Sequence, residues 1–195
     1  IDFLNQKNIK SIIIDHHEIN KPYPSANSII NPKKNNGYKE YDYFSATALT
    51  YFFIEILIKK MKSKMNIQNY LIYVLLANIC DVMPIRKINR VIAIKVLKEF
   101  KINENQIFNT LYNIKGKKNK ITINDLGYLI GPILNSGGRL HKSNYAVDLL
   151  SAKNEKLITK RSNELVELNE KRKKIENKIL NEIDFNKIEK ENKNI

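Results

Sequence analysis

Cysteine, tryptophan, proline and glycine are all scarce in this sequence. Its 195 residues include one cysteine, no tryptophan, 5 prolines and 6 glycines. The single thiol, Cys80, excludes a disulfide framework and fits a reducing cytoplasm. Long apolar runs are missing as well, so we expect no membrane span, no signal peptide and a cytoplasmic location. The hydrophobic content of 43% supports a folded core.

Acidic residues are outnumbered by basic ones, and the basic set is almost entirely lysine. Lys and Arg number 34 against 20 Asp and Glu, a net charge of +14, yet only 5 of the basic residues are arginine. Such an excess favours a polyanionic partner. Isoleucine and asparagine are abundant too, as an AT-rich genome would produce, so the charge alone is weak support for nucleic-acid binding.

An initial methionine is also absent. The chain begins at Ile1 with what looks like the end of a helix, followed by a polar turn into the first strand. We therefore interpret the sequence as an internal piece of a longer protein. Its length is enough for one large domain, or for one and a half domains of average size.

Apolar patterning predicts an α/β fold: a truncated parallel-sheet lobe, then a mostly helical part and a long C-terminal connecting helix. The predicted helix N-caps are Ser45, Asn66 and, for the helix that starts near 122, either Thr122 or Asn124. The predicted strands are 10–14 and 28–31, and the predicted helices are 45–64, 66–79, 89–100, 104–113, 122–134, 145–150 and 154–183. In the helix 89–100, the residues predicted to face inward are Val91, Ile94, Val96 and Leu97.

Three regions are expected along the chain. Residues 1–85 form the end of the strand-containing lobe, 86–152 a helical continuation with a candidate phosphate-contact loop, and 153–195 a long interdomain helix with a frayed tail. The last region is highly charged, and we expect an exposed helix that joins two lobes. The face predicted for it comprises Leu157, Arg161, Leu165, Leu168, Arg172, Ile175 and Ile179. A parallel sheet without its first strands would expose an apolar edge, so we expect poor stability in isolation.

The tripeptide Asp15-His16-His17 follows directly on the apolar run Ile12-Ile13-Ile14. Ligands bind at the carboxyl ends of strands in open α/β sheets. A carboxylate with two imidazoles suits Mn²⁺, Zn²⁺ or Fe. One imidazole would bind the metal while Asp15 orients a ring. The alternative is a strand end whose polar residues simply face solvent.

Asp81 ends an apolar helix and precedes Pro84. A carboxylate at a helix C-terminus opposes the helix dipole, at a cost of about 0.3–1 kcal/mol. A bound cation would offset this cost, whereas the alternative is an aspartate that makes a turn before the proline.

A third motif lies in the segment Gly131–Leu140, where Gly137 and Gly138 follow a predicted helix. Glycines there allow positive φ, and their exposed N–H groups can cradle an oxyanion. Arg139 could then contact a phosphate, and Asn135 could add a donor. A glycine helix stop with a surface arginine is the alternative.

These motifs, in this order, resemble the DHH phosphoesterases, which are named for the Asp-His-His signature. The glycine segment is similar to that of the RecJ branch, the 5′-to-3′ single-strand-specific DNA exonucleases. The resemblance covers about 9–183. The other matching positions are Asn31-Pro32, Ser45-Ala46, Ala77 to Pro84, Asn89-Arg90, Asp125-Leu126-Gly127 and the long terminal helix.

The resemblance implies two-metal hydrolysis of a phosphodiester with Mn²⁺ or Mg²⁺. It implies that His16 and Asp81 are metal ligands, and that His17, beside the scissile phosphate, and Asp15, which supports it, are catalytic. The phosphate-binding residues that it implies are Asn135, Ser136, Gly137, Gly138 and Arg139. The implied partner is single-stranded DNA, in repair and recombination, with a single-strand-binding protein or a helicase as further partners of a monomer.

Two features depart from the family. Ile133 stands where the family usually has arginine, so one phosphate contact is lost or moved to Lys142. The family's Asp-x-Asp metal motif lies upstream of the signature and is not in this sequence, so we expect the fragment to be inactive alone. The alternatives are an oligonucleotide or cyclic-dinucleotide phosphodiesterase of the same family and a non-catalytic DNA-binding scaffold.

Overall fold

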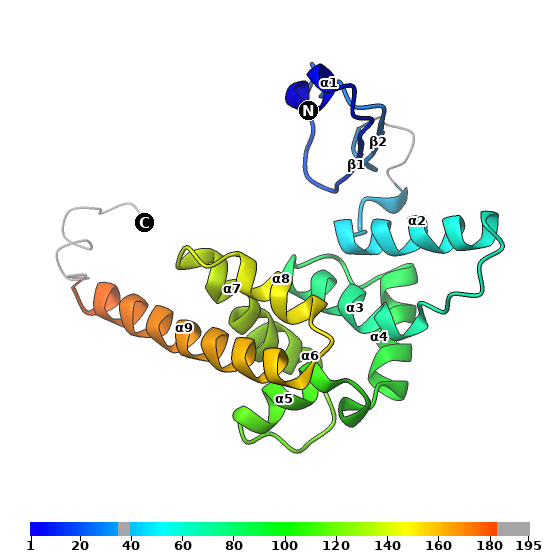
Figure 1. Ribbon diagram of the computed structural model, residues 1–195. Helices are drawn as coiled ribbons and strands as arrows, with labels where there is room; N and C mark the ends of the chain where they lie inside the picture. Colours follow the sequence, from blue (N-terminus) through cyan, green and yellow to red (C-terminus); the bar gives the residue numbers. More distant parts are fainter. Residues whose placement is uncertain (35–39, 183–195) are drawn as a thin grey trace, which may run out of the picture. The chain divides into compact units, whose positions relative to one another are not determined.

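The computed structural model describes residues 1–34 and 40–182 of the chain (Figure 1). The chain forms two compact units. The first comprises Ile1–Phe100 and Ile121–Gly127, and the second comprises Lys101–Lys120 and the residues from Tyr128 onward. The predicted boundaries at 85 and 152 differ from this division, because 86–100 packs with the first unit and the long helix with the second. The predicted tail from 183 onward lies outside the described residues.

The first unit contains a short parallel sheet that confirms the predicted α/β pairing. Strands β1 (Ile12–Ile14) and β2 (Ser28–Ile30) run parallel, with Ile12 opposite Ser28. Both strands are shorter than predicted. The amide of Asp15 donates to the carbonyl of Ile30 at 3.0 Å, which continues the pairing to the first residue of the tripeptide. Helix α1 (Asp2–Gln6) precedes the sheet, as the opening pattern predicts.

Helix α3 is the most buried element of the first unit, and it packs against both α2 and α4. Besides α1, this unit contains α2 (Ala46–Lys60), the 3₁₀ turn η2 (Gln68–Tyr70), α3 (Leu71–Cys80), α4 (Lys87–Glu99) and α6 (Ile123–Asp125). Ser45 caps α2 as predicted, since its Oγ accepts from the amide of Ala48 at 3.2 Å. Asn66 is not the N-cap that was predicted: Ile67 is the N-cap of η2, and the side chain of Asn66, one residue earlier, accepts from the amide of Gln68 at 2.9 Å.

The buried face of α4 differs from the prediction. Val91 and Ile94 were expected to face inward, but they are 63% and 58% exposed. The buried residues are instead Asn89, Ile92, Ala93 and Val96. Asn89 explains the shift, because its amide donates to the carbonyl oxygens of Tyr43 and Pro84 and so holds its own side of the helix against the core.

The second unit is entirely helical in its described part. Its elements are η3 (Ile102–Glu104), α5 (Gln106–Ile114), α7 (Gly131–Arg139), α8 (Asn144–Ser151) and α9 (Glu155–Glu182). A π-helical segment, η4 (Leu126–Ile130), leads into α7. Thr122 forms a capping box with Asp125 at the start of α6, as predicted for a helix beginning there. This helical run continues through Gly137 and Gly138, whereas the prediction ended it before them.

Helix α9 is the packing centre of the second unit, not an exposed connector along its whole length. It lies against α5, α7 and α8, as Figure 1 shows. Its buried residues are Ile158, Ser162, Leu165 and Asn169, so only Leu165 of the predicted face is fully buried. Ile175 and Ile179 are exposed, and the exposed-helix prediction therefore holds for the C-terminal turns only. Across the described ranges, no helix combines the length and apolar character needed to cross a membrane.

Candidate functional site

The tripeptide Asp15-His16-His17 is held at the end of β1 by its neighbour β2. Asn31, the residue after β2, is 6% exposed and donates from its side chain to the carbonyl of His17 at 3.0 Å. The same side chain accepts from the amide of Lys33 at 2.8 Å. Asn31 therefore fixes the backbone of His17. Sequence reasoning assigned Asn31 no individual role; the signal was its place at the end of the second strand, before Pro32.

Asp15 contacts the ring of His17 and not that of His16. The Oδ1 atom of Asp15 lies 2.7 Å from Nδ1 of His17, whose side chain is 76% exposed. Partial burial acts to raise the pKa of the Asp15 carboxyl, but the His17 side chain and the backbone amides of His16 and His17 outweigh it and lower that pKa. An ionised Asp15 favours the proton on Nδ1 of His17, which leaves Nε2 open to solvent.

His16 faces Asp81, which is far from it in the sequence. The Nε2 atom of His16 lies 3.7 Å from Oδ2 of Asp81, and their side chains are 13% and 43% exposed. This separation is too long for a hydrogen bond. Two ligands that each lie about 2.1 Å from one octahedral ion are about 3.0 Å apart. A small approach of the two side chains would therefore let them share a metal ion.

The backbone around Asp81 is unfavourable by itself. Val82, the next residue, is exposed and has φ of +53°. A β-branched side chain is strained in this left-handed region. Asn78, one turn earlier in α3, is fully buried, and its side chain has no hydrogen-bond partner within the described part of the chain. The C-terminal end of α3 therefore has three unfavourable features: the strained backbone of Val82, the unpaired side-chain amide of Asn78 and the carboxylate of Asp81.

The donor set at this place fits a metal ion only in part. Among residues 1–34 and 40–182, no group of three or more His, Cys, Asp or Glu side chains is arranged to hold a metal ion. Magnesium and similar cations take about six ligands, several of which are commonly water. His16 and Asp81 thus fit as two ligands of an ion whose remaining ligands lie elsewhere.

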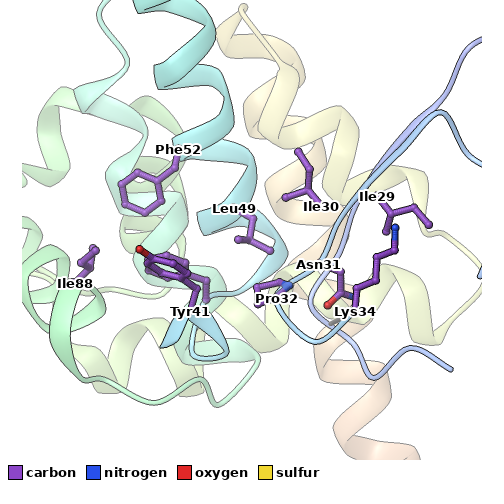
Figure 2. A pocket seen from close by; sticks show the side chains of 10 residues that line it. Ile29, Ile30, Asn31, Pro32, Lys34, Tyr41, Leu49, Phe52 and Ile88 are labelled. Carbon is purple, nitrogen blue, oxygen red and sulfur yellow. The ribbon is translucent and has the colours of Figure 1, made fainter. Parts of the chain in front are cut away.

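A cavity of about 540 Å³ opens beside β2 in the same unit, and the sequence did not predict it (Figure 2). Its lining is mostly apolar and comes from β2, the residues after it, α2 and α4. It comprises Ile29, Ile30, Asn31, Pro32, Lys34, Tyr41, Phe44, Leu49, Phe52 and Ile88. Asn31 connects this cavity to the tripeptide, because its side chain also anchors His17.

The segment that was predicted to be a phosphate-contact loop is helical in the structure, because it lies in α7 of the second unit. Gly137 and Gly138 lie inside α7, and Gly116 is the glycine for which the described chain shows a positive φ. A Cβ atom at Gly137 would lie 2.5 Å from the carbonyl oxygen of Lys142, so this glycine permits close packing. The hydroxyl of Ser136 is buried and donates to the carbonyl of Leu165 at 3.0 Å. Ser136 and Gly137 therefore serve the core.

Three residues of this segment remain at the surface: Asn135, Gly138 and Arg139. Ile133, which replaces the family's arginine, is fully buried and extends the core of the second unit. The phosphate contact stays a prediction, and of its five residues Asn135, Gly138 and Arg139 are the exposed ones. These lie in the second unit, whereas the His16–Asp81 pair lies in the first.

Comparison with known proteins identifies the relatives of this chain, although no family model matches it. The single-stranded-DNA-specific exonuclease RecJ of Haemophilus influenzae is 28% identical over 186 residues, which cover 90% of this chain. RecJ of Escherichia coli K12 is 26% identical over 180 residues. Crystallised RecJ from Thermus thermophilus in complex with Mn²⁺ superposes with a TM-score of 0.80 over 92% of this chain, at 20% identity. The chain is thus similar in sequence to RecJ exonucleases and has the fold of the corresponding part of the solved RecJ structures.

The RecJ-type segment covers only part of its relatives. It spans 32% of the Haemophilus influenzae protein and 31% of the Escherichia coli protein, about a third of each. A second structure, an exonuclease RecJ bound to manganese, also gives a TM-score of 0.80 and is covered over 46% of its length. Another Thermus thermophilus structure contains Mg²⁺.

Proposed function

We propose that this RecJ-type chain is part of a metal-dependent phosphodiesterase that hydrolyses single-stranded DNA from the 5′ end. The observation that carries the proposal is the convergence of His16 and Asp81, 3.7 Å apart, from the ends of β1 and α3. The relatives are named as single-stranded-DNA-specific exonucleases, and the solved neighbours contain Mn²⁺ or Mg²⁺. Both facts support a divalent ion at this pair.

The residues of the site would divide into metal ligands, a group that accepts a proton and groups that contact phosphates. His16 and Asp81 would hold one Mn²⁺ or Mg²⁺, which when bound polarises a phosphoryl oxygen and lowers the pKa of a water ligand. Asp15 holds the ring of His17, so Nε2 of that exposed imidazole can accept a proton or hydrogen-bond to substrate. Arg139 and Asn135 supply donors for backbone phosphates in the second unit.

Metal binding by the 195-residue chain tests this assignment. His16→Asn removes one of two ligands, so we expect the dissociation constant for Mn²⁺ to rise at least about tenfold. The dissociation constant can be measured by titration, with the electron paramagnetic resonance signal of free Mn²⁺ as the readout. The matched control is His141→Asn, the same change at the remaining histidine, which lies outside the pair and has a positive φ that asparagine tolerates. An equal effect of the two substitutions would contradict the proposal.

The chain alone supplies two ligands in its described part, and we expect it to hydrolyse DNA far more slowly than Escherichia coli RecJ. Release of nucleotides from a 5′-labelled single strand in Mn²⁺ measures the difference. Equal rates would show that the donor set is more complete than the pair.

The shortage of donors also favours a second candidate, a non-catalytic DNA-binding scaffold. In that case His16→Asn would leave both Mn²⁺ binding and single-strand binding unchanged. Hydrolysis of a cyclic dinucleotide in preference to the labelled strand would favour the related small-substrate phosphodiesterases instead.

A further inference from the structure

The C-terminal end of α2 and the turn after it expose apolar side chains to solvent. Of the ten residues 56–65, four are large apolar residues at the surface: Ile56 is 53% exposed, Leu57 37%, Met61 75% and Met65 64%. Single exposed apolar residues are ordinary, whereas several together mark an interaction surface. Figure 1 shows this end of α2 at the margin of the first unit. We name residues 56–65 the α2 tip.

Every charge on the α2 tip is positive. The tip has no aspartate or glutamate, and its charged residues are Lys59, Lys60, Lys62 and Lys64. Lys59 pairs with Glu55, one turn earlier in α2, at 3.5 Å. The other three lysines form no ion pair with any described residue. The tip therefore combines exposed apolar side chains with positive charge that the described chain does not neutralise.

The backbone of the α2 tip is already hydrogen-bonded, so it can leave water without losing hydrogen bonds. The amides of Met61, Lys62 and Ser63 donate to carbonyl oxygens of the last turn of α2 at 2.8 to 3.2 Å. The amide of Met65 donates to Oγ of Ser63 at 3.3 Å. Unpaired amides would oppose entry into an apolar layer, because burial of an amide without a partner is unfavourable.

We propose that the α2 tip binds an anionic lipid bilayer, with Met61 and Met65 inserted at the level of the headgroups and the lysines at the lipid phosphates. Apolar side chains bordered by lysines are typical of surfaces that lie on a membrane. Each lysine near an anionic surface strengthens binding about fivefold, and apolar side chains strengthen it further by leaving water. None of the described helices could cross a membrane, so the contact is peripheral. It goes beyond the proposed hydrolysis and does not depend on it.

Other partners fit the α2 tip less well. A nucleic acid would meet the lysines, but methionine and isoleucine offer no aromatic ring on which a base can stack. In a symmetric dimer the tip would face its own copy, so its lysines would repel one another. Residues 59–66 are exposed without interruption, so the tip protrudes and offers no groove to an acidic peptide. A bilayer provides both an anionic surface and an apolar interior.

A tryptophan in the α2 tip would report insertion directly, because the sequence contains no tryptophan of its own. Met61→Trp is mixed with vesicles of phosphatidylglycerol and phosphatidylcholine in equal parts. We expect its emission to shift to the blue and to be quenched by lipids with brominated acyl chains. Ile94→Trp is the matched control, since Ile94 is also an exposed apolar residue on a helix of the first unit. Equal quenching of the two tryptophans would overturn the inference.

Two methionine substitutions test the apolar part of the contact. Met61→Gln combined with Met65→Gln should weaken co-sedimentation with the same vesicles at least about tenfold. Both side chains are exposed, so the melting temperature should not change. An unchanged affinity would contradict the proposal, because the net charge of +14 alone would then explain the binding. An equal loss of binding to an oligonucleotide of thymidine would assign the tip to nucleic acid instead.

Two lysine substitutions test the charged part. Lys60→Gln combined with Lys64→Gln should weaken vesicle binding about 20- to 30-fold, at about fivefold for each lysine. Lys7→Gln combined with Lys10→Gln removes the same charge from exposed positions of the first unit outside the tip, so its effect should be smaller. Equal losses would mean that the tip is not the site of contact.

The unaltered chain must also prefer anionic lipid. Equal binding to vesicles of phosphatidylcholine alone, or no binding to either kind of vesicle, would overturn the inference. So would a dimer in sedimentation velocity that the two methionine substitutions dissociate, because a second copy would then cover the tip. The metal-dependent hydrolysis has its own test with Mn²⁺ and His16→Asn, so the two proposals can fail separately.

Discussion

Gly137 and Gly138 are adjacent in α7 but differ in burial and in structural role. Gly137 is buried where the chain returns after α7, and the amide of Lys142 donates to its carbonyl at 2.7 Å. Gly138, the next residue of α7, is exposed. Both have helical backbone, so the difference between them comes from what surrounds the missing side chain.

We predict opposite effects on stability from alanine at these two positions. Gly137→Ala forces a methyl group to 2.5 Å from the carbonyl oxygen of Lys142, and we expect a loss of about 2 kcal/mol. Gly138→Ala adds a methyl group whose only neighbour is Oδ1 of Asn135, at an ordinary contact distance of 3.8 Å, and should stabilise the helix by about 0.5–1 kcal/mol. Urea unfolding followed by circular dichroism measures both. Equal stabilities would mean that Lys142 does not approach Gly137 as described.

At the same scale, Asp81 and Val82 form a locally unfavourable pair. The carboxylate lies at the C-terminus of α3, and the valine after it has positive φ. Each feature costs on the order of 1 kcal/mol. Such costs persist where function requires the geometry, and a cation held by Asp81 and His16 would offset the first of them.

At the scale of elements, α9 is joined to α5 by a charged contact as well as by its buried face. Lys115, at the C-terminal end of α5, donates to Glu170 of α9 at 3.1 Å. The hydrogen bond and charge of Lys115, with a further contribution from Lys173, lower the pKa of the Glu170 carboxyl. The exposed pair adds little stability, because solvent screens it.

The ion pair between Lys115 and Glu170 should make the stability of the chain depend on pH. A lowered carboxyl pKa contributes stability above its ordinary value of 4.5, and the contribution is lost as the pH falls through the lowered pKa. Glu170→Gln should therefore reduce the melting temperature slightly at pH 7, and the reduction should vanish once the pH lies well below the lowered pKa of Glu170. Glu167→Gln, an exposed change on the same helix, is the control. A difference that persists at low pH would show that Glu170 acts through packing and not through charge.

At the scale of the whole molecule, the net charge of +14 has a measurable consequence. Binding of a single strand should weaken as salt rises, by about 0.7 logarithmic units of affinity per unit of log salt for each phosphate contacted. Arg139→Gln should reduce this slope by about 0.7, because one contact is removed. Arg172→Gln should leave it unchanged, since Arg172 is paired with Glu176 at 2.9 Å. Equal slopes for all three proteins would place the strand elsewhere.

Local sequence signals were sufficient to predict much of the secondary structure. The caps at Ser45 and Thr122, the two strands and the places where the helices occur all depend on residues within a few positions of one another. The resemblance to RecJ-type DHH proteins likewise depended on short motifs in order, and the comparisons support it. The position of Asp15-His16-His17 at a strand end follows from the same local pattern.

Only the tertiary structure showed which of these helices and strands pack against one another. A periodic helix does not specify which of two adjacent apolar faces is buried. In α4 the buried face is set by the side-chain amide of Asn89, which donates to the carbonyl oxygen of Tyr43, 46 residues away. Gly137 and Ser136 belong to the core because α9 and Lys142 pack there, and no local pattern reports that. The approach of His16 to Asp81 is likewise set by how the sheet meets α3, because contacts between distant residues depend on packing rather than on neighbouring sequence.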